Sequence, residues 1–216
     1  MMLPADFDHL VIAVPNLAES VEQCEAALGV RPVPGGVHPG LGTANALLGL
    51  DIGGTRAGRA YLEILGPDPD QDPQLSAPRL GGVSAPIVQR WAIHPSDFDG
   101  AVAAAAGSSD PAVDLGEVHD MTRRTPEGET LRWRLTRRIP LALGGIQPFL
   151  IDWLDSPHPA SRDMPSVSLA QFWATSPDPA EPRAVLAALD ARIEVEEGET
   201  DALHARLEGP RGPWIL

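Results

Sequence analysis

An apolar run followed by a segment of helical periodicity opens the chain. Residues 8–14 are mostly apolar and β-branched and stop at a Pro-Asn turn, which predicts a strand. Apolar residues then recur at helical spacing over residues 17–28, with glutamates opposite them, which predicts an amphipathic helix. Asn16 stands where an N-cap is expected, and Gly29 where a left-handed residue ends a helix.

Three short strands are predicted next, over residues 30–34, 45–50 and 60–65. A glycine-rich loop, residues 35–43, separates the first two of them and would let the backbone approach a ligand closely. Its glycine spacing matches no dinucleotide or phosphate-binding fingerprint, so we expect no nucleotide cofactor. Strand, helix and three strands make one βαβββ module over residues 6–67.

The same order of elements returns after a proline-rich connection, residues 68–86. The second module spans residues 87–155 and repeats the first at a spacing of about eighty residues. One of its strands, residues 130–137, alternates strictly, which places Trp133 and two leucines on one face. Residues 165–216 predict a partial third βαβ unit packed on the two modules. We therefore expect an α+β fold.

Composition and charge limit the classes of partner. The 216 residues carry a net charge of -14, which argues against binding to nucleic acid or to an anionic membrane surface. That field would favour a cationic ligand, although a well-solvated acidic surface is the simpler interpretation. No apolar run approaches the roughly 18 residues of a membrane span. The lone Cys24 and the absence of a signal-like N-terminus fit a cytoplasmic protein.

Two strands of the first module each carry one metal-capable side chain, His9 and Glu63. Aligning the strand-to-helix entries of the two modules carries His9 onto Arg90, and aligning the closing strands carries Glu63 onto Asp152. Three of the four positions could bind a metal, whereas arginine has no lone pair to donate. Arg90 would repel a cation, pair with Asp152, or hold a carboxylate of the substrate.

The order of elements and several short segments resemble a known family. With Asp8-His9 at the start and Tyr61-Leu62-Glu63 at the close of its first module, the chain resembles the glyoxalase-like domain branch of the vicinal oxygen chelate superfamily. Residues 38–45, 128–133 and 148–159 resemble the same branch. The resemblance implies two βαβββ modules that form a curled, barrel-like sheet around a cleft, where a small molecule binds.

The resemblance also implies a metal site. Superfamily members that use a metal take ligands from the first and last strands of each module, which implies His9, Glu63 and Asp152 here. One imidazole and two carboxylates suit a divalent metal such as Zn, Ni, Fe, Mn or Co. The metal would polarise two adjacent substrate oxygens in a lyase or isomerase. The family equally includes non-catalytic proteins that sequester a ligand, as in drug resistance, and pairing of units between chains would give a homodimer.

Other side chains complete the candidate site. His38, before a proline on the glycine-rich loop, is either a turn residue or a general base. Trp133 either fills the core or offers its face to a planar ligand. We take Glu63 and His38 as the catalytic candidates. The ligand-binding candidates are Arg90, His38, Asn45, Trp133 and His158.

Overall fold

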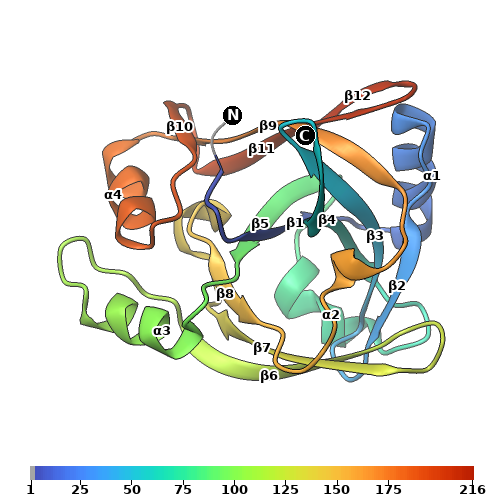
Figure 1. Cartoon of the computed structure of the whole chain (residues 1–216), viewed down its shortest axis with the longest axis horizontal. Coiled ribbons are helices and arrows are strands. Elements are labelled where there is room, and N and C mark those ends of the chain that lie inside the picture. Colours follow the sequence, from blue (N-terminus) through green and yellow to red (C-terminus); the bar gives the residue numbers. More distant parts are fainter. Residues whose placement is uncertain (1–2) are drawn as a thin grey trace.

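The computed structural model describes residues 3–216, apart from the side chains of residues 55–59 (Figure 1). The elements are, in order, β1 (Phe7–Ala13), α1 (Leu17–Leu28), β2 (Val33–His38), β3 (Thr43–Ile52), β4 (Thr55–Pro67), α2 (Pro73–Leu80), β5 (Ile87–Ile93), α3 (Phe98–Gly107), β6 (Glu117–Arg124), β7 (Thr130–Arg137), the short 3-10 helix η1 (Ala142–Gly145), β8 (Phe149–Asp152), the 3-10 helix η2 (Pro159–Ser161), β9 (Ser166–Ser176), α4 (Ala180–Ala188), β10 (Glu194–Glu197), β11 (Ala202–Gly209) and β12 (Gly212–Ile215).

The two βαβββ modules share one strand order, as the sequence predicts. In the first, β1 lies parallel to β4, which pairs with β3 and then β2 in antiparallel fashion. In the second, β5 lies parallel to β8, which pairs with β7 and then β6 in the same way. The first helix begins and ends as expected, because the Asn16 side chain accepts from the Glu19 amide at 3.2 Å and Gly29 adopts a φ of 76°.

The modules join at both edges and so close a ring of eight strands. β1 pairs with β5 in antiparallel fashion, and β2 meets β6 at Val37 and Arg124. This second junction depends on Gly36, where a Cβ atom would stand 2.0 Å from the backbone oxygen of Arg124. Gly36 also has a φ of 140°, which side chains rarely tolerate. The ring is the curled, barrel-like sheet that the resemblance implies.

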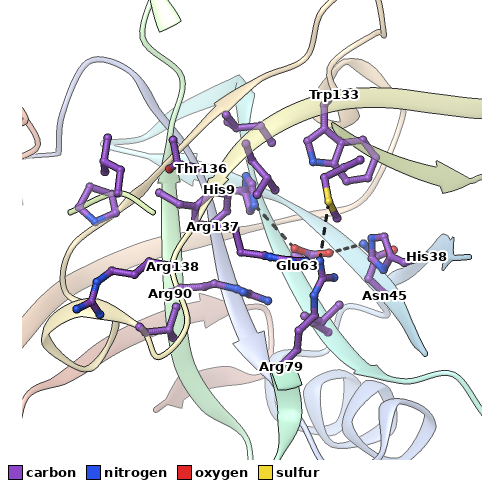
Figure 2. Close-up of a pocket in the computed structure, with 18 of the residues that line it drawn as sticks. His9, His38, Asn45, Glu63, Arg79, Arg90, Trp133, Thr136, Arg137 and Arg138 are labelled. Carbon is purple, nitrogen blue, oxygen red and sulfur yellow. Dashed lines mark hydrogen bonds and ion pairs between the residues drawn. The ribbon is translucent and has the colours of Figure 1, made fainter. Parts of the chain in front are cut away.

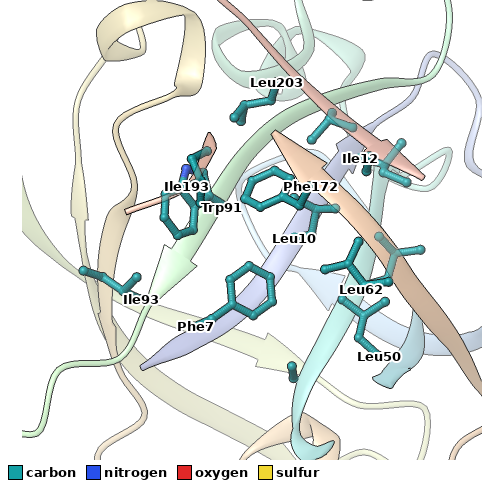
Figure 3. Close-up of a cluster of buried hydrophobic side chains, with 14 of the residues drawn as sticks. Phe7, Leu10, Ile12, Leu50, Leu62, Trp91, Ile93, Phe172, Ile193 and Leu203 are labelled. Carbon is teal, nitrogen blue, oxygen red and sulfur yellow. The ribbon is translucent and has the colours of Figure 1, made fainter. Parts of the chain in front are cut away.

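The C-terminal segment adds the expected βαβ unit, in which β9 and β10 are parallel with α4 between them. It continues into β11 and β12, and β9 pairs with β3, so these strands extend the sheet along the top of the view in Figure 1. The unit shares one core with the modules (Figure 3). Phe172 packs against Trp91 and Phe7, with ring centroids 5.4 and 6.1 Å away.

Three details differ from the sequence-based expectation. The proline-rich connection contains α2, because Pro73 occupies its first turn, where no amide donor is needed, and Asp72 caps it. The prediction of a loop over residues 35–43 is wrong for its first half, because Gly35 and Gly36 lie inside β2 beside a bulge. The strand β12 was not expected. In the described part of the chain no helix has the length and apolar character to cross a membrane.

Candidate functional site

A pocket runs inside the barrel, and all eight of its strands contribute lining residues (Figure 2). It brings together six of the residues singled out by the sequence. They are His9, His38, Asn45, Glu63, Arg90 and Trp133. Two further candidates, Asp152 and His158, are not among its lining residues.

Glu63 lies near the middle of the labelled residues, with donors from two other strands beside it (Figure 2). The Asn45 side-chain amide donates a short hydrogen bond to Glu63 Oε1, and His9 Nε2 lies 3.8 Å from Glu63 Oε2. Burial would raise the pKa of this carboxyl, but the positive potential of His9 and the Asn45 hydrogen bond outweigh burial and lower the pKa. Glu63 is therefore a deprotonated carboxylate that faces the pocket.

His9 is oriented by its neighbour in the sequence. Its ring is 2% exposed, and its Nδ1 lies 2.6 Å from Asp8 Oδ1, so the N–H at Nδ1 donates to the carboxylate. The ring also stacks on Tyr61 with centroids 4.5 Å apart. These two contacts fix the imidazole and direct Nε2 toward Glu63.

Asp8 is a buried carboxylate that accepts several hydrogen bonds, a role that no pattern in the sequence predicts. Trp153 Nε1 and His158 Nε2 each lie 3.0 Å from Asp8 Oδ2, on the side away from His9. Burial would raise the pKa of Asp8, but the hydrogen bonds from His158 and His9 hold it well below its usual range. His158 thus anchors the segment after β8 to β1 through Asp8 and contacts the pocket only indirectly.

His38 ends β2 and is a buried pocket residue. It is 4% exposed, its Nδ1 lies 3.0 Å from Thr43 Oγ1, and its ring meets the edge of Trp133 at a centroid distance of 6.1 Å. Burial lowers the pKa of His38 to about 4, an effect that the nearby charge of Glu63 offsets only in part. The imidazole is therefore neutral near pH 7, in a wall of the pocket beside Glu63.

Arginines dominate the charge of the pocket. Its lining includes Arg79, Arg90, Arg123, Arg137 and Arg138. Arg138 pairs with Asp114 at 2.9 Å, whereas the other four form no ion pair within 4.0 Å with any described carboxylate. Figure 2 shows Arg79 and Arg90 extending toward Glu63 from different sides, while Arg138 points away. The sequence singled out only Arg90 of this group.

Arg123 is the most deeply buried of these side chains, with 2% of its surface exposed. Its Nη1 lies 3.5 Å from Asn45 Oδ1, while its Nε and Nη2 have no hydrogen-bond partner among the described residues. Burial lowers the pKa of this guanidinium, although Tyr61 and Glu63 counteract the shift. Alternation along β6 could have identified Arg123, because it shares a face with the buried Met121.

The structure does not bring Asp152 to the pocket. Arg134 on β7 donates from Nε to Asp152 Oδ2 at 2.9 Å and also binds Asp99. The neighbouring residues of β8, Phe149 and Ile151, line the pocket instead, so Asp152 points to the other face of the sheet.

Strand register explains this difference. Val11 pairs with Glu63 in the first module, and Ala92 pairs with Phe149 in the second. Ala92 and Val11 are equivalent in the alignment that carries His9 onto Arg90. The counterpart of Glu63 is therefore Phe149, and the expected alignment of the closing strands was out of register by three residues.

This donor set does not fit the expected divalent metal. His9 and Glu63 supply two donors, and the equivalent positions in the second module hold an arginine and a phenylalanine. The described residues contain no group of three or more histidine, cysteine or acidic side chains placed to hold a metal. A guanidinium beside Glu63 would also repel a cation. We therefore derive no chemical step through a metal.

Comparisons with known proteins agree with the architecture. The family model described as the glyoxalase-like domain matches residues 7–189. A hypothetical protein from Staphylococcus aureus is similar in structure, with a TM-score of 0.63 and 16% identity over 97% of this chain and 84% of that one. This likeness shows a shared fold.

Two enzymes from Streptomyces coelicolor are more distant in structure. A methylmalonyl-CoA epimerase variant in complex with 2-nitronate-propionyl-CoA has a TM-score of 0.46 and 24% identity, over 68% of this chain and 96% of its own. A 4-hydroxymandelate synthase mutant has a TM-score of 0.45 and 18% identity, over 100% and 63%. No curated protein matches the chain.

The buried His38 predicts a pH-dependent stability. The unfolded chain binds a proton at this histidine below about pH 6.5, whereas the pKa of about 4 keeps the folded chain unprotonated there. The free energy of unfolding should therefore fall by about 3 kcal/mol as the pH drops from 6.5 to 4. Urea unfolding of wild type and His38→Gln at both pH values measures this. In His38→Gln, the difference in free energy of unfolding between the two pH values should be much smaller. In His119→Gln, a control at a partly exposed position of β6, the difference should be the same as in wild type.

The register predicts which substitutions would create a metal site. Arg90→His combined with Phe149→Glu places two further donors opposite His9 and Glu63, so the double variant should bind one zinc ion per chain. Metal content after equilibration with zinc and desalting measures this. Arg90→Leu removes the same charge without adding a donor and should bind none. If the wild type binds stoichiometric metal and Glu63→Gln does not, the conclusion that these donors do not fit a divalent metal is wrong.

Proposed function

Because the chain belongs to the glyoxalase-like domain family, we propose that its inter-module cleft binds a small molecule, and that this ligand is an organic anion. The observation that carries the proposal is Arg123. A buried guanidinium with two unpartnered donors is costly to keep, since each such group loses water without gaining a partner. A bound carboxylate would supply the missing acceptors in a bidentate arrangement.

The charge of the pocket lining favours an anionic ligand, although the net charge of the whole protein favours a cationic one. The chain as a whole carries -14, yet five arginines and, among the described lining residues, a single carboxylate surround the pocket. Charges inside a pocket interact more strongly than charges spread over a wet surface, because fewer water molecules screen them. The cationic ligand that the net charge favours would meet four unpaired guanidinium groups, so it fits poorly.

The rest of the lining favours an organic ligand over a bare ion. Trp133, Phe149, Ile151 and Met121 provide apolar and aromatic surface next to the arginines. An apolar wall with a few placed charges is the usual composition of a small-molecule site. A carboxylate attached to a hydrocarbon or aromatic body would contact both parts of this lining.

A substitution at Arg123 separates stability from binding. Arg123→Met should raise the free energy of unfolding of the ligand-free protein by about 1–3 kcal/mol, because an unpaired buried charge disappears. It should also weaken carboxylate binding at least tenfold. Chemical unfolding measures the first effect. Calorimetry and thermal shift with succinate and benzoate as carboxylate probes, and benzylamine as a cationic probe, measure the second.

The matched control is Arg124→Met, the adjacent arginine on the exposed face of β6. It should change neither quantity appreciably. Stabilisation of the wild type by benzylamine but by neither carboxylate would overturn the proposal. So would equal carboxylate affinity in wild type and Arg123→Met.

Proton transfer is a second candidate function, favoured by the state of Glu63. This carboxylate is deprotonated, held by Asn45 and beside arginines. It could accept a proton from a carbon next to a carbonyl group, while the electron pair moves onto the carbonyl oxygen and Arg90 stabilises the resulting enolate. The 2-oxo acids combine this acidic carbon with two adjacent oxygens and a carboxylate.

Exchange of carbon-bound hydrogen tests this candidate directly. In deuterium oxide, the wild type should speed the loss of the C3 protons of 2-oxobutanoate relative to buffer, as measured by proton NMR. Glu63→Gln should slow that exchange by about 100-fold or more while still binding the acid. Glu117→Gln, at an exposed position of β6, is the control and should behave as wild type. Binding without faster exchange would instead favour a ligand-sequestering protein.

A further inference from the structure

A second cavity adjoins the arginine pocket on its outer side. Its walls come from the end of α2 and the following turn, β5, residues 139–144, and residues 201–204 of the third unit, together with Leu216. Three residues line both cavities, namely Arg79, Arg90 and Leu141. The two cavities therefore meet at the arginine pair, and we call the second one the outer groove.

The outer groove is largely apolar and partly open to solvent. Ile87 and Ile139 both line it and are 44% and 54% exposed, so two exposed apolar side chains belong to one cavity. Val83 and Leu203 add further apolar wall from two distant parts of the chain. A hydrocarbon body placed here would remove this surface from water, at a gain of about 0.8 kcal/mol per methylene group.

Hydrogen-bonding capacity differs between the two cavities. In the arginine pocket the unpartnered atoms are donors, the Nε and Nη2 of Arg123. In the outer groove the unpartnered atoms are acceptors, Gln89 Oε1 and Asp201 Oδ1, neither of which has a partner among the described residues. The orientation of Gln89 follows from its amide, which donates to the Arg79 carbonyl at 2.8 Å. Because acceptors repel a carboxylate, the outer groove does not suit the anionic end of a ligand, whereas its apolar wall suits an apolar body.

We propose that the outer groove binds the apolar body of the same ligand whose carboxylate lies among the arginines. The ligand class is then an amphipathic organic acid that is long enough to pass between Arg79 and Arg90. This inference rests on the proposed function, because it assumes the anion in the inner pocket. It also gives the third unit a role, since residues 201–204 and Leu216 close one side of the groove.

A chain-length series tests the inference. Straight-chain monocarboxylates from butanoate to decanoate serve as probes, with affinities from titration calorimetry. In the wild type, the dissociation constant should fall about three- to fourfold for each added methylene that enters the groove. Ile139→Asn places a neutral polar group on the groove wall, so it should flatten this dependence and leave butanoate affinity unchanged.

The matched control is Ile215→Asn, at an isoleucine that is 57% exposed on β12 and lines neither cavity. It should keep the full chain-length dependence. Butanoate binding with no dependence on chain length would overturn the groove inference and leave the proposed function intact. Failure of every acid to bind would overturn both. Equal loss of affinity for all lengths in Ile139→Asn would also overturn the groove inference, because a separate subsite would not affect butanoate.

Discussion

The site depends on one buried carboxylate, that of Asp8. It accepts hydrogen bonds from His9 in the first module and from Trp153 and His158 after the last strand of the second. A buried charge is tolerated only when its acceptor capacity is filled, so these three donors must stay in place together. The contact therefore ties the end of the second module to β1, and it fixes the ring that faces Glu63. These three hydrogen bonds thus add to the strand pairing that joins the modules, and they orient His9 in the pocket.

Around His9, the pocket carries a cluster of arginines that stability alone would not favour. Five of its sixteen arginines line one pocket while the rest of the chain is strongly acidic. Burial lowers the pKa of Arg79 to about 10, and the adjacent Arg90 adds to the shift through like-charge repulsion. Local conflicts of this kind are typical of functional sites, where a ligand supplies what the free protein lacks. The exposed apolar wall of the outer groove is a second feature of this kind, because a ligand would cover it.

Local patterns in the sequence predicted the elements better than the contacts between them. The helix Leu17–Leu28 and the strand Thr130–Arg137 have the expected bounds, because caps, periodicity and alternation are encoded by neighbouring residues. Asp152 was misplaced because β8 has four residues and its register is set by β5 and β7, which are distant in sequence. Arg79 was missed because the prolines around it conceal a helix.

Repetition of one module explains how the same barrel can hold a cation in two different ways. Equivalent strands present His9 and Glu63 in one half, and Arg90 and Phe149 in the other. Donors at all four positions would hold an exchangeable metal ion, whereas an arginine at position 90 supplies a fixed positive charge. A guanidinium is permanently charged and directional, so it can bind a carboxylate and leave Glu63 without a metal to neutralise it. An arginine and a phenylalanine at the two equivalent positions of the second module therefore change the chemistry of the cleft while the fold stays the same.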